Sequence, residues 1–116
     1  MEIRIVRDTI SKKELADVAS AGFGDMVKAV VDITQGVMAV GGELHADEEA
    51  LLTEQCGSKR EDVWGINLYP QKVGAEWIEF DSMINLKPQF GNRSRGVEDA
   101  MTQEKVVEVV NKLVRA

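Results

Sequence analysis

The sequence contains one cysteine, one histidine and two prolines in 116 residues. A single cysteine cannot form an internal disulfide, which favours a reducing environment such as the cytoplasm. No run of apolar residues approaches the length needed to cross a bilayer, and the first residues have the pattern of a strand, not of a signal peptide. We therefore expect a cytoplasmic protein that does not enter membranes.

The sequence also lacks the short motifs that identify common enzyme classes. It has no phosphate-binding Walker loop, dinucleotide-binding fingerprint, nucleophile elbow or paired-cysteine motif. The reaction class and any cofactor therefore stay unknown at this stage.

Basic residues are fewer than acidic ones, 14 against 20, which gives a formal net charge of −6. Nucleic acids and anionic membranes bind basic surfaces, so neither is an expected partner. The charge is uneven, because residues 43–62 are acidic on balance whereas Lys87, Arg93 and Arg95 form a basic patch. Such a patch on an acidic protein suits a small anionic ligand, or a second copy of the chain that docks acid to base.

Periodicity and capping signals predict one domain over residues 1–116, with the element order β-α-β-β-(α)-β-β-α. The clearest signal is a capping box from Ser11 to Glu14, which starts a helix. The predicted elements are strands at residues 3–6, 27–33, 37–40, 63–69 and 77–87, and helices at residues 12–21, about 47–52 and 101–114. We expect an α+β fold, with a mainly antiparallel or mixed sheet of about five strands and helices packed on one face.

Residues 77–99, WIEFDSMINLKPQFGNRSRGVED, begin with a strand of two different faces. Strand side chains alternate with a period of two, so one face is apolar (Ile78, Phe80, Ile84, Leu86) and the other polar (Glu79, Asp81, Asn85, Lys87). Ser82 interrupts the apolar face, so a bend or a bulge is expected near Asp81 and Ser82. We predict that this is the central strand and that its polar face forms the floor of a site.

His45 is the only histidine. If the strand that starts at Val37 continues as far as His45, Glu43 and His45 share a face, and the central strand brings Asp81 beside them. A histidine next to carboxylates can act as a general acid or base, or can bind a metal with open positions. A lone histidine is weak evidence for a metal. We therefore predict Glu43, His45 and Asp81 as catalytic candidates and assign no metal; the structural alternative is a histidine hydrogen-bonded to nearby acids.

Residues 91–96 form a Gly- and Arg-rich turn before Asp99, which is the predicted N-cap of the last helix. The guanidinium groups of Arg93 and Arg95, with backbone N–H groups of the helix start, can hold a phosphate or a carboxylate. Asn85 and Glu79 are predicted as further ligand contacts on the polar face. The alternative is that both arginines pair with carboxylates of the chain itself and stabilise the turn.

Three segments, GGELHADEEALL, DVWGINLYP and WIEFDSMINLKPQFGNRSRGVED, together resemble a small prokaryotic family known only as a domain of unknown function. The similarity covers nearly the whole chain. The resemblance implies no activity, substrate or catalytic residue.

Two hypotheses follow from the sequence. In the first, the histidine, carboxylate and arginine side chains form a site for a small anionic ligand that bears a phosphate or carboxylate, with or without catalysis. In the second, the protein is a non-catalytic homo-oligomer or partner-binding protein, and the same residues form salt bridges in an interface. A homo-oligomer is expected in either case, because symmetric association uses the acidic and basic regions at once.

Overall fold

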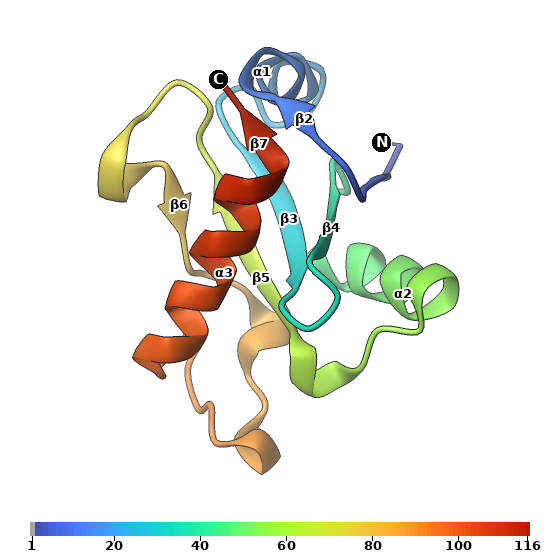
Figure 1. The fold of residues 1–116 in the computed structure, drawn as a ribbon, viewed down its shortest axis with the longest axis vertical. Helices are drawn as coiled ribbons and strands as arrows, with labels where there is room; N and C mark the ends of the chain where they lie inside the picture. Colours follow the sequence, from blue (N-terminus) through green and yellow to red (C-terminus); the bar gives the residue numbers. More distant parts are fainter. Residues whose placement is uncertain (1) are drawn as a thin grey trace.

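A computed structural model describes residues 2–116 and has a five-stranded antiparallel sheet at its centre (Figure 1). The sheet order is β1-β4-β3-β5-β6, and a separate parallel pair joins β2 to β7. The helices and strands are β1 (Arg4–Val6), β2 (Ile10–Ser11), α1 (Lys12–Ala21), β3 (Val27–Asp32), β4 (Val37–Val40), α2 (His45–Cys56), β5 (Val63–Leu68), β6 (Ile78–Glu79), α3 (Ala100–Leu113) and β7 (Val114–Arg115). The predicted α+β class with a five-stranded sheet is confirmed.

The helices α1 and α3 begin where their capping residues predict. The Ser11 hydroxyl accepts a hydrogen bond from the Glu14 amide at 3.0 Å, and the Glu14 carboxylate accepts one from the Ser11 amide, so the capping box is complete. At α3 the Asp99 carboxylate accepts from the Thr102 amide at 2.9 Å. These local bonds fix two helix starts without help from tertiary packing.

The sheet is buried on both faces. The main core lies between the sheet and α1 with α3, and includes Leu15, Ile66 and Val110; Figure 1 shows α3 crossing in front of the sheet. A smaller cluster lies on the opposite face, where Leu52 of α2 packs against Val30 of β3. The prediction of helices on one face therefore holds for α1 and α3, whereas α2 covers part of the other face.

The segment predicted as the central strand forms an edge strand of the sheet instead. The strand β6 contains only Ile78 and Glu79 and pairs with β5 alone, whereas β3 pairs with β4 and β5 and is the central strand. After β6 the backbone is still extended at Ser82, and the chain then bends in a 3-10 turn at Met83–Asn85. The prediction of a central strand there was wrong.

The bend also moves apolar residues to the other face of the sheet. Ile78 packs against the main core, whereas Ile84 belongs to the smaller cluster beside α2. The Asn85 side chain then occupies the place of a strand partner for Gly65 of β5. Its Oδ1 accepts from the Gly65 amide at 2.8 Å, and its Nδ2 donates to the Gly65 carbonyl at 3.0 Å. One carboxamide thus replaces the backbone pairing that a longer β6 would have supplied.

Candidate functional site

A polar cleft of about 390 Å³ lies on the sheet face opposite α1 and α3. It is formed by the start of α2, by β3, β5 and β6, and by the segment that follows β6. The residues that line it are Met26, Lys28, Leu44, His45, Ala46, Asn67, Glu79, Asp81, Ser82, Met83, Ile84 and Arg95. The charged and amide side chains in this set come from four separate segments, so only the folded chain brings them together.

His45 is the first residue of α2 and is 7% exposed. Its Nε2 lies 2.8 Å from the Ile66 carbonyl, which can only accept, so this nitrogen carries the proton. Burial lowers the pKa of the ring below 6.5; the positive charge of Lys28 acts in the same direction, and the hydrogen bond to Ile66 opposes both. The ring is therefore neutral at pH 7, and its Nδ1 is an acceptor.

The start of α2 has no side-chain cap, because the N-cap position is Leu44. The amides of Asp47 and Glu48 donate to the Leu44 carbonyl. Leu44, His45 and Ala46 all line the cleft, so the positive end of the helix dipole opens onto it.

Lys28 supplies a positive charge beside this helix start. Within the part of the chain that the structure describes, Lys28 forms no ion pair; its Nζ lies 5.5 Å from the centroid of the Phe23 ring. The charge of Lys28 lowers the pKa of both His45 and Glu48, two residues of the first turn of α2. A cation without an acid partner and an uncapped helix start therefore line the same cleft.

The two carboxylates of the cleft are already hydrogen-bonded. The Glu79 Oε1 accepts from Asn67 Nδ2 at 2.8 Å and from the Tyr69 hydroxyl at 3.0 Å. Asp81 accepts from Arg95 Nε at 2.6 Å. This use of Nε leaves the terminal NH₂ groups of Arg95 outside that bond.

Asn67 has a buried acceptor with no donor. The residue is 6% exposed, and its Nδ2 donates to Glu79 and to the Asp81 carbonyl, which fixes the orientation of the amide. Its Oδ1 is buried and has no hydrogen-bond partner within residues 2–116. Asn67 raises the pKa of His45, because a protonated ring can donate to this amide whereas the neutral Nδ1 cannot. Protonation of His45 at Nδ1 would therefore give the unsatisfied Asn67 Oδ1 a hydrogen-bond donor.

The structure brings four of the residues predicted from the sequence into this cleft: His45, Asp81, Glu79 and Arg95. Three others lie elsewhere. Glu43 is exposed and does not line the cleft, because β4 ends at Val40 and the strand alternation that placed Glu43 beside His45 does not apply. Asn85 is fully buried and bonded to Gly65, so it is not available to a ligand. Arg93 is exposed and lies outside the cleft.

Lys87 was predicted to belong to the basic patch but is fully buried. Its Nζ donates to the carbonyls of Arg60 at 2.7 Å and Val63 at 2.6 Å, and lies 3.7 Å from the centroid of the Trp64 ring. This lysine stabilises the fold and does not contribute to a surface site.

Comparison with known protein families gives a match over most of the chain. Residues 4–113 match the family described as "protein of unknown function (DUF5674)". The chain belongs to this family. No curated protein and no solved structure matches it. The resemblance inferred from the three sequence segments is thus confirmed as membership of a family of unknown function, and the function of this DUF5674 protein has to be argued from its own cleft.

Residues 2–116 of this DUF5674 protein give two further findings. Within that range, no helix has the length and apolar character needed to cross a membrane. No group of three or more histidine, cysteine, aspartate or glutamate residues is placed to hold a metal ion. The predicted homo-oligomer and the cytoplasmic location stay predictions.

Sequence reasoning missed Lys28 and Asn67 as site residues. Each is a polar residue flanked by apolar ones in a strand: Lys28 lies between Val27 and Ala29, and Asn67 between Ile66 and Leu68. Because the flanking residues face the main core, period two places both polar residues on the opposite face. The alternation of side chains along these two strands was therefore the signal that could have identified Lys28 and Asn67 as site residues.

Replacing Arg95 with alanine should change the free energy of unfolding by less than about 1 kcal/mol. The pair with Asp81 is short, but the two side chains are 56% and 44% exposed, so water solvates both charges when the pair is broken. Urea denaturation of wild type and Arg95→Ala measures the difference. A loss of several kcal/mol would mean that the ion pair supports the fold, as the structural alternative for this arginine requires.

Proposed function

We propose that this protein binds a small anionic ligand in the polar cleft, and that His45 takes up a proton as the anion binds. The observation that carries the proposal is that Lys28, which has no ion pair within the described chain, and the uncapped start of α2 line the same cleft. Helix N-termini and lysine side chains are established partners of phosphate, sulfate and carboxylate groups. The buried, unsatisfied Oδ1 of Asn67 in the same cleft is the second observation.

The electrostatics of the cleft are consistent with an anion despite its two carboxylates. Glu79 is hydrogen-bonded to Asn67 and Tyr69, and Asp81 is paired with Arg95, so neither needs a cation from outside the chain. An anion near Lys28 reduces the repulsion between that lysine and a charged imidazole. The protonated His45 ring can then donate through Nδ1 to Asn67 Oδ1 while Nε2 keeps its bond to Ile66.

Proton uptake gives the binding a defined pH dependence. The pKa of free His45 is lowered from 6.5, and a bound anion raises it. Between these two pKa values the complex holds more protons than the free protein, so the affinity for the anion rises as the pH falls through that interval.

The test uses sulfate, because its charge does not change over the relevant pH range. We expect calorimetric titration to give saturable binding that strengthens as the pH falls from 8 through the range in which His45 becomes protonated. Lys28→Gln should weaken the binding roughly tenfold, as for the loss of one charge-assisted hydrogen bond. His45→Gln should retain binding but lose the pH dependence, because glutamine does not titrate.

Arg93→Gln is the matched control. It removes one exposed guanidinium from the same turn as Arg95 but lies outside the cleft, so it should leave the affinity for sulfate unchanged. Equal losses in Lys28→Gln and Arg93→Gln would indicate binding to the general surface charge and would contradict the proposal. An absence of sulfate binding at every pH would contradict it as well.

A further inference from the structure

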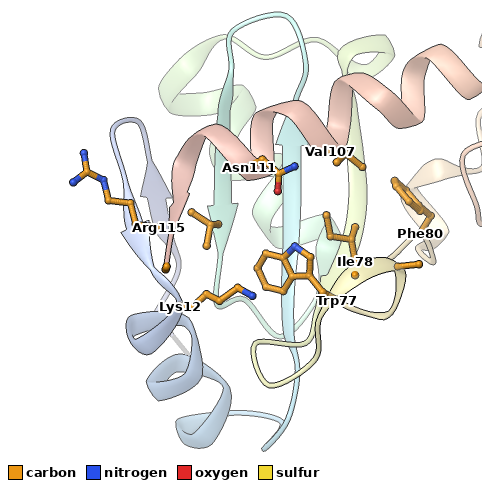
Figure 2. A pocket seen from close by; sticks show the side chains of 11 residues that line it. Lys12, Trp77, Ile78, Phe80, Val107, Asn111 and Arg115 are labelled. Atoms are coloured by element: carbon orange, nitrogen blue, oxygen red, sulfur yellow. The ribbon is translucent and has the colours of Figure 1, made fainter.

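A second, largely apolar groove lies on the other side of the sheet from the polar cleft (Figure 2). Its volume is about 590 Å³, within the roughly 300–1,000 Å³ typical of small-molecule sites. The residues that line it are Lys12, Gly74, Ala75, Trp77, Ile78, Phe80, Val107, Asn111, Val114, Arg115 and Ala116. They come from the start of α1, the segment from the 3-10 turn before β6 to just after it, and the end of the chain from α3 onward.

The walls of the groove offer apolar contact along its length. Figure 2 shows the Trp77 ring in the centre, with Ile78 and Phe80 beyond it and Val107 above, on α3. Ile78 and Phe80 pack against the main core only in part, so their remaining surface faces the groove. An apolar ligand here would cover side chains that the fold itself leaves half-buried, which is the source of hydrophobic binding energy.

One cation lies at an end of this apolar surface. The Lys12 Nζ is 4.6 Å from the centroid of the Trp77 ring and forms no ion pair within residues 2–116. Figure 2 shows the guanidinium of Arg115 pointing away from the groove, so Lys12 is the cation that a ligand would meet. No aspartate or glutamate side chain lines this groove, although acidic residues outnumber basic ones in the chain.

We propose that this groove binds an apolar molecule that carries one carboxylate, such as a medium-chain fatty acid. The apolar part lies along Trp77 and Val107, and the carboxylate pairs with Lys12. The charged side chains of the lining favour a negative group on the ligand, because such a group gains from Lys12 and no acidic side chain lines the groove. The site is separate from the polar cleft and does not depend on the function proposed there.

The test compares three probes with the same ten-carbon chain, each below the concentration at which it forms micelles. Decanoate is expected to change the tryptophan fluorescence of the protein in a saturable way, because Trp77 forms part of the groove. Decanol should bind about fivefold more weakly, the ratio that corresponds to roughly 1 kcal/mol for a solvent-accessible ion pair. Decylamine should bind most weakly, because its ammonium repels Lys12.

Variants locate the site. Lys12→Gln should reduce the affinity for decanoate to about that for decanol, a loss of about fivefold. Lys13→Gln is the matched control, since this neighbouring lysine pairs with Asp17 and does not line the groove. Val107→Trp should fill the groove and abolish binding of decanoate and decanol together. Lys28→Gln, which disables the polar cleft, should leave decanoate binding intact.

Four results would overturn this inference. Three of them are the absence of saturable decanoate binding to wild type, equal affinities for decanoate and decylamine, and equal losses in Lys12→Gln and Lys13→Gln. Decanoate binding that survives Val107→Trp would place the ligand elsewhere and would overturn it as well.

Discussion

Glu48→Gln should stabilise the protein at neutral pH, by about 3 kcal/mol at pH 7. Glu48 is completely buried under the start of α2, and burial raises the pKa of its carboxyl from 4.5 to about 9. Its Oε2 accepts from the Gly42 amide at 2.9 Å, whereas its Oε1 is buried without a partner in the described chain. One hydrogen bond does not compensate for removing a charge from water, so the folded protein keeps this group protonated.

The direction of the pH effect follows from these two pKa values. The folded protein binds the proton of Glu48 more tightly than the unfolded chain does. The contribution of Glu48 to stability is therefore complete below about pH 4.5, falls as the pH rises, and is lost above about pH 9. Glutamine stays neutral throughout, so the advantage of Glu48→Gln should be near zero at pH 4 and grow toward pH 9.

Urea denaturation of both proteins across this pH range measures the difference between their free energies of unfolding. All other groups titrate alike in the two proteins, so their contributions cancel in this difference. The control is Glu54→Gln, which removes the same charge from an exposed position on the same helix. It should give a small difference that does not vary strongly with pH. A Glu48→Gln variant that is less stable than wild type at pH 7 would contradict this prediction.

Asn85→Asp should destabilise the fold by about 3–5 kcal/mol at neutral pH, the cost of an uncompensated buried charge. The Asn85 Nδ2 donates to the carbonyls of Gly65 at 3.0 Å and Arg95 at 2.9 Å. In the variant, a carboxylate oxygen would face both carbonyl oxygens in a site from which water is excluded. The size and shape of the side chain barely change, so the loss measures the two donors and the charge.

The loss should shrink at acidic pH, because a protonated carboxyl is neutral and can donate one hydrogen bond again. Denaturation experiments at neutral and acidic pH test both statements. Asn111→Asp makes the same chemical change at an exposed position on α3, and its effect should stay within about 1 kcal/mol. Equal effects of the two variants would contradict the structural role of the Asn85 amide.

Much of the fold could be predicted from the sequence because its signals are local. The capping box at Ser11, the N-cap at Asp99 and the hairpin turn before Val37 each depend on a few adjacent residues, and the structure contains all three. The limits of β5 were also close to those predicted, since its pattern is continuous. Such elements form in the same way in many tertiary contexts.

The prediction of a strand at residues 77–87 was wrong for a reason that the alternation of apolar and polar residues cannot reveal. Its pattern is consistent with a strand, but Ser82 packs so close to Gly65 that a Cβ on that glycine would lie 2.5 Å from the serine Cβ. The chain can therefore approach β5 only where β5 has no side chain. This is a relation between two residues far apart in the sequence, and the pattern of either segment alone does not contain it.

Only part of the candidate site could be predicted, because its arrangement also depends on residues that lie far apart in the sequence. His45 and Asp81 do line one cleft, although His45 reaches it from a helix start and not from the strand that was assumed. Glu48 lies in the acidic first turn of α2 but is fully buried, because Gly42 leaves space for its side chain. The side of a helix that faces the sheet depends on how the preceding turn directs the chain, and short segments do not determine that direction.

The Asn85 carboxamide also has a consequence for association between molecules. An edge strand with free backbone N–H and C=O groups is a template on which another chain can add a strand. Because β6 pairs with β5 only at Asn67 and Leu68, Gly65 would be such a template if the side chain of Asn85 did not occupy its donor and its acceptor. This single side chain therefore protects the edge of β5 against intermolecular β-pairing, and its loss would favour aggregation even in molecules that remain folded.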